Sequence, residues 1–123
     1  MYTLSVEHHI DAAHALRGYK GKCEALHGHR FRVAVKAEAE RLDHIGLACD
    51  FTDLKAKLKE ALAPFDHVCL NETPPFDKIN PSSENIARTV YGAMKKSLEG
   101  APVALAGVTV WESPENCVEY TER

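Results

Sequence analysis

Two stretches of this chain alternate apolar and polar side chains with a period of two, and this pattern limits the possible folds more than any other feature. In residues 2–10 the apolar side chains fall at even positions, and in residues 31–37 they fall at odd positions. A period of two predicts strands with one buried face each. Between them, residues 17–22 hold two glycines and three cations without an apolar period, which indicates a loop. We therefore expect two paired strands.

The rest of the chain predicts two helices and then two further strands. Thr52 can cap a helix whose leucines recur every four residues at Leu54, Leu58 and Leu62. Ser82 or Ser83 can cap a second helix, and strands are expected at 103–111 and 117–120. The apolar face of the second helix comprises Ile86, Val90, Met94 and Leu98. This order predicts an α+β fold, an antiparallel sheet with both helices on one face. The other face is expected to be apolar and covered by oligomerisation.

Length and charge exclude several classes of protein. The 123 residues suit one domain, 1–123, and a net charge of −3 argues against a general nucleic-acid binder. No apolar run reaches membrane-spanning length, and residues 1–7 lack the pattern of a signal peptide. We therefore expect a cytoplasmic protein with no nucleic-acid or membrane partner, whose four cysteines are thiols.

Three histidines predict a metal site. His27 and His29 are two residues apart at the start of the second strand, so their side chains point to the same side. His14 follows the first strand, and strand pairing can bring it to the same point. Three imidazoles with no evident fourth ligand are typical of an open, catalytic Zn²⁺ site. An isolated pair of this spacing is usually accidental, so the neighbouring residues carry much of the argument.

Cys23 lies four residues before His27, between Lys22 and Glu24 in the loop. A thiol near Zn²⁺ and imidazoles loses its proton more readily and can act as a base or nucleophile. The alternative, a small buried apolar residue, suits the other cysteines better, because they lie among apolar neighbours.

Six motifs together resemble the 6-pyruvoyl-tetrahydropterin synthase family, whose bacterial branch includes the 6-carboxy-tetrahydropterin synthases of the queuosine pathway. The resemblance spans essentially the whole chain, and its motifs occur in the family's order. They are Ala12-Ala13-His14, Cys23 to His29, Asp50-Phe51, Asp66-His67, Asn80 to Glu84 and Trp111-Glu112. The resemblance implies the T-fold, a four-stranded antiparallel sheet with two helices on one face. It also implies a barrel-forming homohexamer of two trimers, with pockets between subunits.

The resemblance also implies roles for individual residues. Zinc would be held by His14, His27 and His29, and Cys23 would remove a proton. Asp66 would orient His67 as a proton shuttle. The pterin ring would be recognised by Glu112, whose carboxylate can accept two adjacent N–H donors, and by the segment Ser82, Ser83 and Glu84. Helix capping is an alternative role for that segment.

The expected function is a zinc-dependent lyase that converts 7,8-dihydroneopterin triphosphate to 6-carboxy- or 6-pyruvoyl-tetrahydropterin. One branch of the family carries a glutamate one position after the cysteine, and it resembles a folate-pathway enzyme that forms 6-hydroxymethyl-7,8-dihydropterin. This chain has both Cys23 and Glu24, so it can combine the two activities, or Glu24 can simply face solvent. A non-enzymatic metal- or pterin-binding module is the alternative from another class, but it would not need Cys23, Asp66 or His67.

Overall fold

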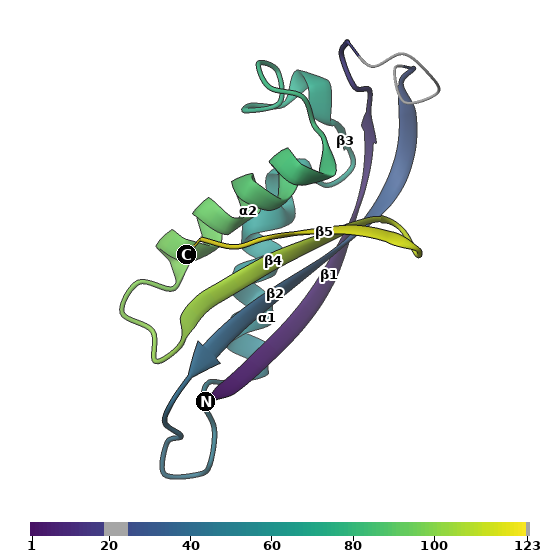
Figure 1. Cartoon of the computed structure of the whole chain (residues 1–123). Coiled ribbons are helices and arrows are strands. Elements are labelled where there is room, and N and C mark those ends of the chain that lie inside the picture. The colour runs from purple at the N-terminus through teal and green to yellow at the C-terminus, as the bar shows by residue number, and fades with distance from the viewer. Residues whose placement is uncertain (19–24, 123) are drawn as a thin grey trace.

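The computed structural model describes residues 1–18 and 25–122, and it shows two helices packed on one face of a twisted sheet (Figure 1). The chain runs through β1 (Tyr2–His14), β2 (His27–Ala39), α1 (Phe51–Leu62), β3 (Val68–Cys69), α2 (Ser83–Ser97), β4 (Ala104–Ser113) and β5 (Asn116–Tyr120). Short 3-10 helices at Ala63–Phe65 and Leu70–Glu72 flank β3. No helix in the described part of the chain is both long and apolar enough to span a membrane.

The sheet has the strand order β3-β1-β2-β4-β5 and is not closed into a barrel. Its four longer strands are antiparallel, as expected. The expected count of four strands omitted β3, which pairs parallel to β1 through Ala12–Val68 and Ala13–Cys69. Two residues are too few to show a period, so nothing in the local sequence marks this strand. Because β3 is parallel to β1, the sheet is mixed.

The core lies between the sheet and the two helices. The inward positions of β2, including Phe31, Val33 and Val35, are fully buried. They meet the predicted apolar faces of the two helices: Leu54, Leu58, Leu62, Ile86, Val90, Met94 and Leu98 are all buried. The helix starts differ slightly from expectation. Asp50, not Thr52, caps α1 by accepting the Thr52 N–H at 2.7 Å, and Ser82 caps α2.

The outer face of the sheet is polar, so the prediction of an apolar outer face was wrong. The alternation that buries even residues of β1 and odd residues of β2 turns the charged residues between them outward. Two ion pairs join the neighbouring strands β1 and β2 on this face, Asp11–Arg30 at 3.1 Å and Glu7–Arg32 at 3.4 Å. A third, Lys36–Glu119 at 3.0 Å, links β2 to β5 across β4. The Arg32 guanidinium also lies over the Trp111 ring, 3.8 Å from its centroid.

Candidate metal and acid–base site

Three histidines meet at one end of the sheet, on the face that carries the helices. His14 ends β1 directly opposite His27, which begins β2, and His29 is opposite Ala12. The centroids of the three rings are 4.5–5.3 Å apart. The hairpin register therefore gathers the imidazoles that the sequence predicted would converge.

Two of these rings are held by backbone carbonyl groups. His14 Nδ1 lies 2.7 Å from the Pro81 carbonyl oxygen, and His27 Nδ1 lies 2.7 Å from that of Ala25. A carbonyl oxygen only accepts hydrogen bonds, so each Nδ1 donates, and Nε2 of a neutral ring then carries the lone pair. Histidine ligands of metals are typically oriented in this way.

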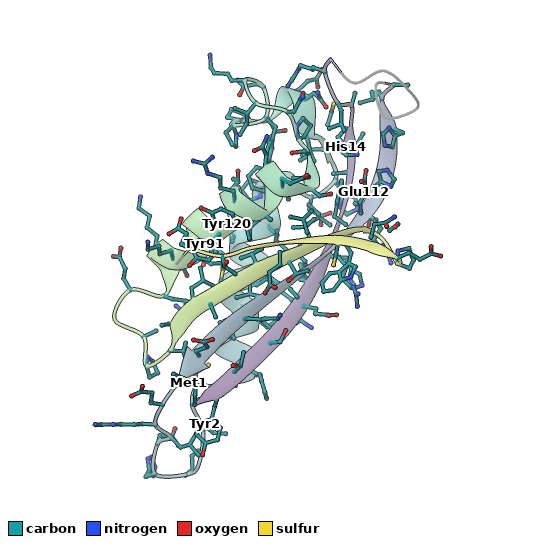
Figure 2. All side chains as sticks on the ribbon, viewed as in Figure 1. Met1, Tyr2, His14, Tyr91, Glu112 and Tyr120 are labelled. Carbon is teal, nitrogen blue, oxygen red and sulfur yellow. The ribbon has the colours of Figure 1, made fainter. Side chains whose placement is uncertain are left out.

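Glu112 on β4 reaches the same point, and Figure 2 shows it beside His14. Its Oε1 lies 3.2 Å from His14 Nε2 and 3.3 Å from His29 Nε2. One ligand atom from each of the three histidines and from Glu112 lies within 4.8 Å of all the others, so the group could hold a metal ion. Burial lowers the pKa of His29, and the other two histidines lower it further, although Glu112 opposes them. A neutral His29 suits metal binding, since a ligating imidazole must be deprotonated.

A second cluster comprises Asp66, His67 and Asp11. The Asp66 Oδ1 atom lies 3.0 Å from His67 Nδ1 and accepts the Asp11 N–H at 2.9 Å. The His67 N–H donates to the Asp11 carbonyl oxygen at 2.7 Å, and His67 has φ of 58°, an uncommon value for a non-glycine residue. The hydrogen bond from the Asp11 N–H lowers the pKa of Asp66 below its ordinary value, and the neighbouring His67 lowers it further. Asp66 is thus a fixed carboxylate beside an exposed imidazole.

The two clusters are separate within one chain. Asp11 and His14 are three residues apart on β1, so their side chains point to opposite faces of the sheet. The ligand atoms of Asp11, Asp66 and His67 form a group distinct from that of the three histidines and Glu112. The sequence predicted Asp66 and His67 but not Asp11. Asp11 forms hydrogen bonds with both residues through its backbone N–H and carbonyl groups, and such contacts leave no pattern in the sequence.

The start of α2 adjoins the histidines, because the carbonyl oxygen that accepts the hydrogen bond from the His14 ring belongs to Pro81, two residues before the helix. Ser82 caps the helix by accepting the Asn85 N–H at 3.1 Å, and Glu84 is exposed in the first turn. The Ser83 hydroxyl is buried and has no hydrogen-bond partner among the described residues. The predicted Cys23 and Glu24 lie outside the described residues.

Arg17 also contributes to the arrangement around the histidines. The sequence places it in the loop expected between the first two strands. Its guanidinium donates to the carbonyl oxygens of Asn71, Phe76 and Ile79 at 2.8–3.3 Å. Arg17 thereby fixes the segment that leads from β3 to α2 against the end of β1. The cysteines among the described residues, Cys49, Cys69 and Cys117, are free thiols, as expected.

Comparison with known proteins gives consistent matches over the whole chain. The model of the 6-pyruvoyl tetrahydropterin synthase family matches residues 3–123. A 6-carboxy-5,6,7,8-tetrahydropterin synthase from Synechocystis sp. is 33% identical over 125 residues, covering 98% of this chain and 93% of that protein. A dihydroneopterin monophosphate aldolase from Pyrococcus furiosus is 36% identical over 110 residues, covering 89% of each.

The fold has a counterpart among solved structures. The 6-pyruvoyl tetrahydropterin synthase of Caenorhabditis elegans superposes with a TM-score of 0.86 at 27% identity, covering 99% of this chain and 96% of that one. This likeness confirms the expected T-fold, with β3 as an addition to the four antiparallel strands.

Proposed function

Because this chain belongs to the 6-pyruvoyl tetrahydropterin synthase family, we propose that it is a cytoplasmic, zinc-dependent lyase acting on the side chain of a reduced pterin. The proposed reaction converts 7,8-dihydroneopterin triphosphate to 6-carboxy- or 6-pyruvoyl-tetrahydropterin. The observation that carries the proposal is the convergence of His14, His27 and His29, with two rings oriented by carbonyl groups. A bound zinc ion would make the hydroxyl and adjoining C–H groups of the substrate side chain more acidic.

The residues of the chain would bind the substrate and move its protons. Cys23, as a thiolate, would remove a proton from the side chain. His67 would shuttle a proton, with its ring oriented by Asp66 at 3.0 Å. Ser82, Ser83 and Glu84 would contact the pterin at the start of α2, which adjoins His14 through Pro81. Glu112 would accept N–H donors of the substrate.

The catalytic groups would be brought together by association of several copies of the chain. The histidine group and the Asp66–His67 pair lie in separate clusters, which suits a site shared between subunits. Both edges of the sheet are open along most of their length: β5 is the last strand, and β1 meets β3 only at Ala12 and Ala13. Pairing of such edges between copies would close a barrel. We propose a homohexamer built from two such trimers.

A second function is favoured by one observation. The Pyrococcus furiosus relative, 36% identical, is a dihydroneopterin monophosphate aldolase. Glu24 next to Cys23 supports a related cleavage of a dihydroneopterin-type substrate to 6-hydroxymethyl-7,8-dihydropterin in folate synthesis. In that reaction a carboxylate would take a proton from a substrate hydroxyl group, the step that starts carbon–carbon cleavage.

Product identification tests both proposals. The zinc-loaded protein would be incubated with 7,8-dihydroneopterin triphosphate and, separately, with 7,8-dihydroneopterin, and the products identified by mass. The leading proposal expects a carboxy- or pyruvoyl-tetrahydropterin from the triphosphate. Exclusive formation of 6-hydroxymethyl-7,8-dihydropterin would favour the second function, and recovery of both substrates unchanged would refute both.

A further inference from the structure

We propose that Asn71, Asn80 and Arg17 form an amide clamp, a set of positioning residues that holds the chain beyond β1 against the segment that leads into α2. The inference rests on the proposed function, because these two segments adjoin groups of the proposed reaction. It goes beyond that function by adding three residues that would affect the reaction without touching the substrate.

The two asparagine side chains pair with the backbone as a neighbouring strand would. Asn71 Oδ1 accepts the Ala15 N–H at 2.8 Å, and Asn71 Nδ2 donates to the Ala15 carbonyl oxygen at 2.9 Å. Asn80 makes the same two contacts with the backbone of Arg17, both at 2.9 Å. In an antiparallel ladder, a hydrogen-bonded pair of residues exchanges both bonds in this way. Because β3 pairs with β1 immediately before this point, the two amides continue its pairing beyond the end of β1.

Arg17 joins the two asparagines into one unit. The Asn80 amide holds its backbone, and its guanidinium donates to the Asn71 carbonyl oxygen at 3.2 Å. The same guanidinium donates to the carbonyl oxygens of Phe76 and Ile79 at 2.8 Å and 3.3 Å. Hydrogen bonds from an ionised donor are stronger than those between neutral groups. One residue after β1 therefore holds the segment that leads into α2 at its start, its middle and its end.

The clamp extends to the first turn of α2. Asn85 in that turn donates through Nδ2 to the Asn80 carbonyl oxygen at 2.9 Å, and its backbone N–H donates to Ser82 Oγ at 3.1 Å. Asn80 thus links Arg17 to the start of the helix, where the proposed pterin contacts lie. From Arg17 the chain continues in the other direction toward Cys23. The clamp therefore fixes two segments relative to each other that the proposed reaction brings to one substrate.

Such a clamp would act on the rate through position alone. A displacement of about 1 Å caused by a change far from the chemistry can lower a rate about 100-fold. The side chains of Asn71 and Asn80 are engaged with backbone groups, so these residues are positioning residues and not catalytic ones. Because both contact Arg17, loss of either contact should release the same unit.

The isosteric variants Asn71→Asp and Asn80→Asp test the clamp. Each keeps the oxygen that accepts a backbone N–H but turns an anionic oxygen toward the carbonyl group to which the amide donated. Asn116→Asp is the matched control, because Asn116 is exposed beside the β4–β5 turn and the variant adds the same charge. Asn71→Ala and Asn80→Ala remove the contacts without adding charge, and they replace any aspartate variant that does not fold.

Catalytic efficiency is measured with 7,8-dihydroneopterin triphosphate and expressed per folded, zinc-loaded chain. Each clamp variant should lose about 10–100-fold in kcat/KM, and the control should match the parent. The double variant should lose no more than the weaker single variant, because residues that act as one unit are not additive. A merely stabilising role would lower the melting temperature and leave kcat/KM, measured well below that temperature, at the parent value.

Hydrogen exchange gives a readout that does not depend on activity. The backbone amides of Ala15 and Arg17 should be protected in the parent, and both should lose protection in Asn71→Asp, although Asn71 binds only the first. Parental kcat/KM in both single variants, or losses that multiply in the double variant, would overturn the inference and leave the proposed function standing. A parent that converts neither dihydroneopterin substrate would overturn the proposed function. Loss of protection at Ala15 alone in Asn71→Asp would overturn the clamp, whatever the activity.

Discussion

The substitution Asp66→Asn separates the acid–base pair from the metal site. Asparagine keeps an oxygen that can accept the Asp11 N–H, now bound at 2.9 Å, but it removes the charge that faces His67 at 3.0 Å. A hydrogen bond to a charged group contributes about 1.5–3 kcal/mol and a neutral one about 0.5–1.5 kcal/mol. Because the Asp66 side chain is 33% exposed, solvent screening places the loss near the low end, at about 1 kcal/mol.

The pH dependence of this loss follows from the lowered pKa of Asp66. A carboxyl group whose pKa is lower in the folded state stabilises the fold above its unfolded value, here 3.8, and ceases to do so as the pH falls through the folded value. Asp66→Asn should therefore unfold a few degrees below the parent at pH 7, and the difference should shrink at pH values below 3.8. Thermal unfolding between pH 3 and pH 7 measures this effect. A difference that is unchanged across that range would show that the charge of Asp66 is not its cause.

The activity of Asp66→Asn should fall far more than its stability. Acid–base groups contribute about 10²–10⁴-fold to rates, so a misoriented His67 should lower kcat about 100-fold. Zinc content should not change, since Asp66 lies outside the histidine group. Asp11→Asn is the comparison variant, because it keeps the backbone N–H and carbonyl contacts with the pair and removes only the neighbouring Asp11 carboxylate charge. Full kcat in Asp66→Asn, measured with 7,8-dihydroneopterin triphosphate, would refute the proposed role.

Three further predictions address the metal, the loop and the assembly. His27→Ala should bind less than one-tenth of the zinc of the parent by elemental analysis, and normal zinc content would contradict its role as a ligand. Cys23→Ala should abolish carboxy- or pyruvoyl-tetrahydropterin formation and keep some hydroxymethyl-dihydropterin formation, and Glu24→Gln should do the reverse, as judged by chromatography and mass. If Glu24→Gln changes neither product nor rate, Glu24 is a solvated loop residue. Light scattering should show an oligomer, and a stable, active monomer would overturn the barrel.

The main helices and strands could be predicted because each is long enough for its apolar residues to recur with a recognisable spacing. The alternation in β1 and β2 and the four-residue spacing in α1 and α2 arise from burial of one face, and the structure confirms that burial. The features that were missed depend on contacts distant in sequence. β3 forms where two residues pair with the edge of β1, which lies far from them in the sequence. At the start of α1, Asp50 rather than Thr52 is the capping residue.

The site was predictable to a similar degree. The meeting of His14 with His27 and His29 follows from a hairpin and a two-residue spacing, which the sequence contains. The position of Glu112 depends on the register of β4 against β2, and that register shifts at a bulge between Lys36 and Ala37. No local pattern encodes such a shift. The contact of Glu112 with the histidines therefore required the structure.

The polar outer face changes the reasoning about assembly. An apolar face would be covered directly by another surface, but this face already satisfies its charges through pairs such as Asp11–Arg30 and Glu7–Arg32. The same alternation that turns His14 inward turns Asp11 outward, so the face could not be apolar along β1. The unsatisfied groups of the sheet are instead the backbone N–H and C=O groups along its open edges at β1 and β5. Association through these edges would leave the charged face toward water inside a barrel, and it would add neighbouring chains beside β1, the strand that carries His14 and Asp11.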